Sequence, residues 1–401
     1  MRRSLLFPVS ATVFLVLAAP RGAAGVPVAP GAPVAGSPVT LQAADGTKLA
    51  ATYYSADEKP GPGILLCHQC NRDRSSWNEL AEKLARAGFH VLTVDYRGFG
   101  QSGGPRHGDL PAAERDRVVR DVWPRDLDLA FAYLRARPGV TATLGAGGAS
   151  CGVNNSIKLS KRHPEIRSLV LLSGGTDRSS RQRLQEKSSP PLLVAAADDD
   201  GGVVQYMEWA EAASGNPVNR FVEYQTGGHG TEMFQAHPEL QGEIVAWYEA
   251  TLLGKGKPAS TDNARRRNAP TIRLLLMTDD PGGAGKVLDA LQAEKGKNPG
   301  APILEPVFVN LLGYVLVGEG DSKGGIAILK FNADAHPASS NAWDSLGDAY
   351  LADGQREKAR EASEKALALV GSDTSESEER RELVRKNAQA KLDQLKAKPP
   401  G

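Results

Sequence analysis

The chain has few cysteines, little excess charge and only one long apolar run. Its 401 residues include three cysteines, and no set of cysteines and histidines has the spacing of a structural zinc site. Three cysteines cannot all pair with one another, so the chain is not a disulfide-stapled scaffold, and we expect no structural metal. The 48 basic and 47 acidic residues nearly cancel. This balance argues against nucleic acid or an acidic membrane surface as the main partner.

The apolar run lies at the start of the chain. Residues 5–19 are mostly apolar, two arginines precede them and small residues follow. This pattern is typical of a secretory signal peptide over residues 1–25. A membrane-spanning helix needs about 20 apolar residues, whereas this run is shorter and contains Pro8. We therefore expect export to the periplasm or the extracellular space, without a stable membrane anchor.

Residues 26–37 are rich in Pro, Ala and Gly and predict a flexible lead-in. Residues 39–54 then alternate around Asp45-Gly46, which predicts a β-hairpin. Apolar runs suited to strands buried on both faces recur further on, with helix-compatible segments between them; they cover residues 63–67, 90–94, 140–144, 166–172 and 192–197. Alternation of strands and helices predicts an α/β fold, with a mostly parallel, twisted sheet and helices on both of its faces.

One serine lies in a strand-to-helix turn. Gly148-Ala149-Ser150-Cys151-Gly152 follows the frame G-x-S-x-G, between a strand-like and a helix-like run. In such a turn the backbone is strained, and glycines are needed because a Cβ would collide with the adjoining strand or helix. The start of the helix directs free N–H groups at the place where an oxyanion would form. We predict Ser150 as the nucleophile and the N–H of Cys151 as an oxyanion donor.

A second motif follows an earlier strand. The segment from Asp95 to Ser102 reads D-Y-R-G-F-G-Q-S. Together with the His68 loop and the Ser150 turn, in that order, it resembles the α/β-hydrolase family over about residues 39–253. The resemblance is greatest to the dienelactone-hydrolase and small-esterase branch. It implies a hydrolase that requires no cofactor.

The resemblance implies a catalytic triad in the order serine, acid, histidine. His229 follows the last predicted strand and is surrounded by glycines, which the six other histidines are not, so we predict it as the base. Three aspartates in a row end the preceding strand. We prefer Asp200 as the acid because the spacing to the next helix matches the family, and Asp199 remains the alternative.

The second oxyanion donor is expected in the loop after His68. The family usually has His-Gly there, whereas this chain has His68-Gln69, so the donor is the N–H of either Gln69 or Cys70. We interpret His68 as a structural hydrogen-bonding residue. Only a short polar segment, residues 173–190, separates two later strands, where some family members carry a lid. We therefore expect an open pocket for a small or polar ester substrate.

The fold should bring Cys70 and Cys151 to the same small space. Three interpretations are open for this pair: a disulfide, two free thiols, or Cys151 as a rival nucleophile. The last is the weakest, because a frame centred on Cys151 has Ala149 and Val153 where glycines are expected. A pair between Cys67 and Cys70 is the alternative that C-x-x-C spacing allows.

The remaining residues have a different pattern. Residues 343–350 read W-D-S-L-G-D-A-Y and match the tetratricopeptide signature, with an earlier copy around Leu312-Gly313 and a capping helix over residues 380–395. This predicts a small all-α domain, which could bind a protein partner. The domain boundaries we expect are 1–25, 26–37, 38–253 for the hydrolase, 254–301 for a linker and connecting helix, and 302–397 for the repeats.

These observations predict an exported serine hydrolase that cleaves a carboxylic ester through an acyl-enzyme on Ser150. A peptidase or amidase could use the same triad. A protein of another class, a secreted interaction protein that uses only its repeats, is a further alternative. We expect the polar linker to let the hydrolase part fold without the repeats.

Overall fold

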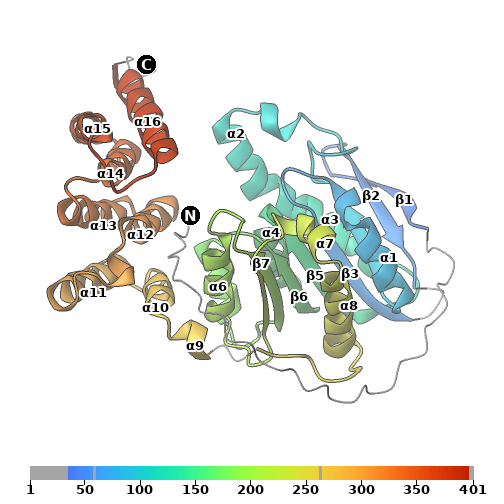
Figure 1. Ribbon diagram of the computed structural model, residues 1–401. Helices are drawn as coiled ribbons and strands as arrows, with labels where there is room; N and C mark the ends of the chain where they lie inside the picture. Colours follow the sequence, from blue (N-terminus) through green and yellow to red (C-terminus); the bar gives the residue numbers. More distant parts are fainter. Residues whose placement is uncertain (1–34, 57–59, 262–263, 397–401) are drawn as a thin grey trace.

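The computed structural model describes residues 35–56, 60–261 and 264–396. The predicted signal peptide and nearly all of the lead-in lie outside these residues. A sheet with helices on both faces occupies the first part of the chain, and a stack of helices lies beside it (Figure 1). This arrangement confirms the predicted α/β fold with a C-terminal all-helical region.

The sheet has eight strands in the order β1-β2-β4-β3-β5-β6-β7-β8 among the described residues. β1 and β2 form the predicted antiparallel hairpin, β2 pairs antiparallel with β4, and the remaining neighbours are parallel. The strands are β1 Ser37–Gln42, β2 Lys48–Tyr54, β3 Gly61–Cys67, β4 His90–Val94, β5 Val140–Ala149, β6 Ile166–Leu172, β7 Leu192–Ala197 and β8 Arg220–Tyr224. Because the parallel strands share one direction, the segments that follow β3, β5, β7 and β8 all emerge at the same edge of the sheet.

Helices cover both faces of this sheet. In the first part of the chain they are α1 Asn78–Arg86, α2 Ala112–Arg117, α3 Trp123–Arg135, α4 Cys151–Arg162, α5 Arg178–Gln185, α6 Val203–Ala213, α7 Met233–Ala236 and α8 Glu239–Leu252. α3, α4 and α6 share one apolar core with the sheet, and α1 and α8 share the other. Neighbouring residues in β3 alternate between these cores, since Leu65 belongs to the first and Leu66 to the second.

The segment expected to be a linker with one connecting helix contains more helical structure than that. Its described part includes α9 Ala264–Arg267, α10 Pro270–Met277 and α11 Gly283–Lys297. Thr261 also lies along the edge strand β8, where its hydroxyl accepts a hydrogen bond from the N–H of Phe221 at 3.0 Å. Apolar residues in α10 that the polar composition around them obscured are buried, including Ile272 and Leu275.

The later helices are α12 Pro306–Gly318, α13 Ser322–Ala335, α14 Ser340–Ala352, α15 Arg356–Val370 and α16 Glu378–Lys396. α12 packs on α13 and α14 on α15. Small residues allow the close approach, because a Cβ on Gly313 would lie 2.4 Å from the side chain of Leu329. α16 packs on α15 and α14 at the end of the stack.

The helical stack is attached to the sheet domain by a buried contact. Trp209 and Ala212 of α6 join an apolar cluster with residues of α10, α11 and α12. Arg181 of α5 forms ion pairs with Asp279 at 2.7 Å and with Glu319 at 3.1 Å, and its side chain is only 1% exposed. The guanidinium also lies over the ring of Trp209, 3.6 Å from the centroid.

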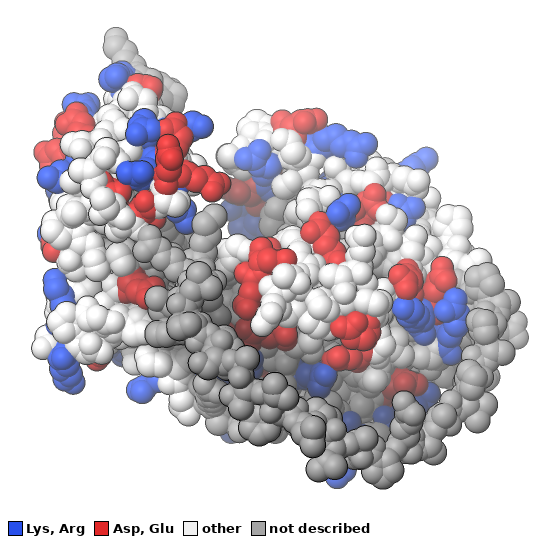
Figure 2. All heavy atoms as spheres, in the orientation of Figure 1, with Lys and Arg blue, Asp and Glu red and all other residues white. Residues whose placement is uncertain are grey.

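The surface carries charges of both signs. Figure 2 shows acidic and basic side chains interspersed over the visible face, with a hollow between the upper helices of the stack and the sheet domain. Neither sign forms a continuous field on that face, as the nearly neutral composition predicts.

Candidate active site

Ser150 occupies the turn between β5 and α4. Its backbone has φ 53° and ψ −118°, a conformation that non-glycine residues rarely adopt. The flanking glycines are required as predicted, since a Cβ on Gly148 would lie 2.0 Å from the carbonyl oxygen of Gly152, and one on Gly152 would lie 2.3 Å from that of Cys67. Ser150 is thus held in a strained turn, directly before the N-terminus of a 12-residue helix.

Asp200 and His229 are brought together from the ends of β7 and β8. The Nδ1 atom of His229 lies 2.9 Å and 2.8 Å from the two carboxylate oxygens of Asp200. Burial raises the pKa of Asp200, while the adjacent His229 and the hydroxyl of Ser173 lower it. An Nδ1–H that donates to this carboxylate leaves Nε2 free to accept a proton.

The neighbouring Asp199 has a different role. Its exposed carboxylate accepts hydrogen bonds from the backbone N–H groups of Gly227 and Gly228, each at 3.1 Å. It therefore stabilises the loop that carries His229 without contacting the imidazole. The geometry favours Asp200 over Asp199 as the partner of His229.

The histidine loop lies against the serine turn. A Cβ built on Gly230 would be 3.3 Å from the Cβ of Ala149, the residue before Ser150. β5 and β7 are separated by β6 alone, and both end at the same edge of the sheet. The structure therefore places the three predicted triad residues at one edge.

His68 is fully buried and makes two backbone hydrogen bonds. Its Nε2 accepts from the N–H of Tyr96 at 3.0 Å, which leaves the proton on Nδ1 to donate to the carbonyl of Gln69 at 2.8 Å. Burial lowers the pKa of this imidazole. These contacts confirm a structural role for His68.

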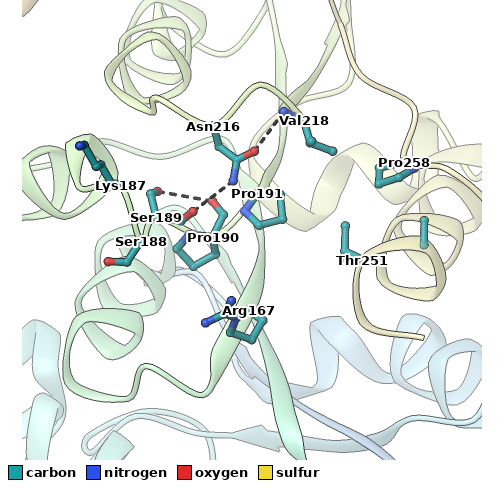
Figure 3. Close-up of a pocket in the computed structure, with 11 residues that line it drawn as sticks. Arg167, Lys187, Ser188, Ser189, Pro190, Pro191, Asn216, Val218, Thr251 and Pro258 are labelled. Atoms are coloured by element: carbon teal, nitrogen blue, oxygen red, sulfur yellow. Dashed lines mark hydrogen bonds between the residues drawn. The ribbon is translucent and has the colours of Figure 1, made fainter. Parts of the chain in front are cut away.

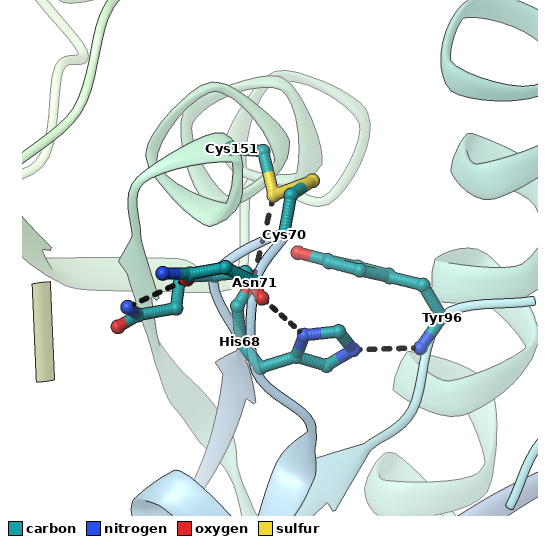
Figure 4. The surroundings of a disulfide bond; sticks show 6 residues. His68, Cys70, Asn71, Tyr96 and Cys151 are labelled. Carbon is teal, nitrogen blue, oxygen red and sulfur yellow. Dashed lines mark hydrogen bonds between the residues drawn. A yellow bond between two sulfur atoms is a disulfide. The ribbon is translucent and has the colours of Figure 1, made fainter. Parts of the chain in front are cut away.

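Cys70 and Cys151 form a disulfide bond with their Cα atoms 5.9 Å apart, as Figure 4 shows. This confirms one of the three predicted alternatives. It also excludes free thiols at these positions and the pairing of Cys67 with Cys70. Cys67 is a buried free thiol, and burial raises its pKa to about 11. The disulfide joins the loop after β3 to the first residue of α4.

Two residues near the site were not identified from the sequence as contributors. The side chain of Gln69 is buried and reaches the loop that carries His229. Ser173, directly after β6, has φ 42° and faces Asp200. Neither has a local sequence signal, because the partners of Gln69 and Ser173 lie 160 and 27 residues away in the chain.

A pocket of about 450 Å³ lies elsewhere. It is lined by Arg167, Pro191 and Thr251 among others, near the beginnings of β6 and β7 (Figure 3). This is the sheet edge opposite Ser150, and none of the predicted site residues lines it. Among the described residues, no group of three or more histidine, cysteine or acidic side chains could hold a metal ion. Within the same residues, no helix is both long and apolar enough to cross a membrane.

Comparison with known proteins gives one family match, to the model described as serine aminopeptidase S33, over residues 58–229. The expected branch was the dienelactone hydrolases and small esterases, which is a different description. An uncharacterized protein of Mycobacterium tuberculosis is 32% identical over 125 residues, which cover 30% of this chain and 44% of that protein. Lipase 3 of a Moraxella species is 27% identical over 134 residues, or 33% of this chain and 38% of the lipase. The chain thus spans less than half the length of these two relatives.

Two solved structures are similar to part of the chain. An esterase of Pyrococcus furiosus has 18% identity and a TM-score of 0.43, with 54% of this chain and 93% of the esterase covered. A predicted CIB-like hydrolase of Thermoplasma acidophilum has 17% identity and a TM-score of 0.42, with 53% and 97% covered. The family match, the strand order and the strained serine turn are independent of these two likenesses. They identify the first part of the chain as an α/β-hydrolase domain.

Proposed function

We propose that this protein is a serine hydrolase that cleaves carboxylic esters. Ser150 attacks the ester carbonyl, His229 takes the proton from the serine hydroxyl and returns it to the leaving alcohol, and Asp200 holds the imidazole in the required tautomer. Water then releases the acyl group by the same steps in reverse. The observation that carries the proposal is the contact of both Asp200 oxygens with Nδ1 of His229, at the sheet edge where Ser150 sits in a strained turn.

The N–H groups of Cys151 and Cys70 are the proposed oxyanion donors. Cys151 begins α4, so its N–H belongs to the unpaired first turn of the helix. For the second donor, the carbonyl of Gln69 accepts from Nδ1–H of His68 and from the N–H of Arg72. In a trans peptide the N–H points opposite to the C=O, so the N–H of Cys70 is directed away from His68. This favours Cys70 over Gln69.

A peptidase or amidase is the second candidate, and the description of the matching family as serine aminopeptidases favours it. The triad chemistry serves both reactions, so substrate choice depends on the pocket. A purely non-catalytic interaction protein is less well supported, because it has no need for a strained serine beside a histidine and carboxylate pair.

Export and the repeats are part of the proposal. The Cys70–Cys151 disulfide supports export, because disulfides persist in oxidising compartments. α12 and α14 begin 34 residues apart, as do α13 and α15, which is the tetratricopeptide period. We propose that these pairs are tetratricopeptide-like and could bind a protein partner.

The test is a substrate panel with purified protein. Short p-nitrophenyl esters, lactones and aminoacyl p-nitroanilides separate esterase from peptidase activity. We expect turnover of short esters and labelling of the wild type by a fluorophosphonate. Ser150→Ala should abolish labelling and lower turnover by about 10³-fold or more. Wild-type turnover by Ser150→Ala would refute the mechanism, and turnover of the anilides alone would select the peptidase.

A further inference from the structure

The side chain of Gln69 connects the oxyanion loop to the loop that carries His229. Its Oε1 accepts hydrogen bonds from the N–H and from the hydroxyl of Thr231, both at 2.8 Å. Its Nε2 donates to the carbonyl of His229 at 3.3 Å and to Asn71 Oδ1 at 2.8 Å. The amide uses its full hydrogen-bonding capacity and is 0% exposed.

The orientation of this amide follows from its backbone partners. The N–H of Thr231 can only donate, so it must face Oε1, and the carbonyl of His229 can only accept, so it must face Nε2. A buried amide with fixed partners restrains both loops more than an exposed contact does, because removal would leave buried polar groups unpaired.

Gly230 provides the space that the Gln69 amide occupies. It has φ +62°, and a Cβ there would lie 2.4 Å from Gln69 Oε1. The backbone of the histidine loop is therefore packed directly against the glutamine side chain. The residues on both sides of Gly230, His229 and Thr231, are those that Gln69 holds through hydrogen bonds.

We propose that Gln69 is a positioning residue for the catalytic histidine. The proposal rests on the proposed function, because it assigns Gln69 to the same triad. By holding the backbone on either side of Gly230, Gln69 keeps the imidazole aligned between Asp200 and Ser150. A small displacement of the imidazole would slow proton transfer without weakening ester binding.

The same two loops share an exposed contact, which offers a matched control. Arg72 forms an ion pair with Glu232 at 2.9 Å, with side chains 53% and 36% exposed. Exposed pairs contribute little. Gln241 in α8 provides a second control, since it is a glutamine of equal burial (1% exposed) outside the site.

The experiment compares Gln69→Ala, Gln69→Glu, Arg72→Ala and Gln241→Ala in the full chain, with p-nitrophenyl acetate as substrate. Endpoint fluorophosphonate labelling counts the competent sites, and kcat is expressed per labelled site. We expect Gln69→Ala to lower kcat about 10- to 100-fold with KM changed less than about threefold. Both control variants should retain kcat.

Gln69→Glu has the size of the native side chain and keeps the acceptor for Thr231, so it tests the proposal even if Gln69→Ala does not fold. It replaces the donor to His229 with a carboxylate oxygen. We expect a lowered kcat and an acid limb of the pH–rate profile shifted to higher pH, because a carboxylate beside this loop stabilises the protonated imidazole.

Unchanged kcat and pH profile in the Gln69 variants, with Ser150→Ala inactive, would overturn the positioning role and leave the proposed function standing. A loss of labelled sites and of melting temperature, with normal kcat per site, would show a purely structural role and overturn it as well. Ester turnover that persists in Ser150→Ala would instead refute the proposed function.

Discussion

Adjacent aspartates at the end of β7 have separate roles because neighbouring residues there point in different directions. Asp200 faces Nδ1 of His229, and Asp199 faces the N–H groups of Gly227 and Gly228. We expect Asp200→Asn to lower kcat by about 10³-fold or more, since the amide favours the wrong imidazole tautomer. Asp199→Asn should cost only a few-fold. Steady-state kinetics of the two variants would decide, and a larger loss in Asp199→Asn would move the acid to that residue.

The acidity of Asp200 also gives a pH dependence. Burial raises its pKa, so the carboxylate is lost at a higher pH than that of an exposed aspartate. Protonation of Asp200 or of His229 removes the ion pair. We expect kcat to fall as the pH is lowered, and a rate that is constant down to pH 4 would contradict the assigned pair.

The disulfide joins the two residues whose N–H groups are the proposed oxyanion donors. Replacing Cys70 and Cys151 by serine should free the loop and lower kcat about tenfold. The lost cross-link spans 81 residues, so on the chain-entropy model its removal lowers the free energy of unfolding by about 4 kcal/mol. Thermal melts and kinetics would measure both effects.

Dithiothreitol provides the control for the disulfide. It should reproduce both losses in the wild type and have no effect on the double variant, because Cys67 is buried and free. Full kcat in the reduced wild type would show that the disulfide does not position the donors.

The helix pairs of the C-terminal stack contain a buried acid. Lys391 of α16 donates to Asp348 at 2.7 Å and lies 2.8 Å from Asp344 Oδ1 of α14. Burial raises the pKa of Asp344 to about 6 despite this lysine. An acid whose pKa is higher in the folded state than in the unfolded state binds more protons when folded. Its contribution to stability is present below the unfolded pKa and is lost as the pH rises through about 6.

We expect Asp344→Asn to remove this loss. The melting temperature of the variant, relative to the wild type, should increase as the pH is raised from about 4 to about 6 and then stay constant. Asp334→Asn, which alters an exposed pair with Lys330, serves as the control and should show no such change. A difference between Asp344→Asn and wild type that is independent of pH would contradict the assignment.

The helical stack and the sheet domain share a buried ion pair. Arg181 and Asp279 are 1% and 2% exposed, and breaking such a pair leaves a buried charge without its partner. We expect Arg181→Ala to reduce the free energy of unfolding by about 3 kcal/mol. Lys286→Ala should cost less than about 1 kcal/mol, because its pair with Asp280 is half exposed. Denaturant titrations of both variants would test this, and equal effects would contradict it.

The same contact changes the expectation for a shortened chain. Ending the protein near Leu253 would uncover Trp209 and Ala212, which α10 and its neighbours cover in the structure. We expect this shorter chain to be less soluble and less stable than the full protein. Light scattering and thermal melts would measure it. A shorter chain as stable as the full one would support the independent folding expected from the polar linker.

Local patterns were sufficient to predict the sheet, the hairpin and the turn at Ser150. Apolar period and glycine position encode these features within a few residues of each other. The histidine could be chosen because His229 follows a terminal strand among glycines. The order of segments that meet at one sheet edge follows from the parallel strands, whatever their side chains do.

Contacts between distant segments required the folded structure. Which of Asp199 and Asp200 meets His229 depends on the direction of a single residue at the end of β7, and the partner of Cys70 depends on the distance across the sheet edge. Gln69 and Arg181 find their partners about 160 and 98 residues away. No local pattern encodes such a pairing, because it arises only when packing brings the two segments within hydrogen-bonding distance.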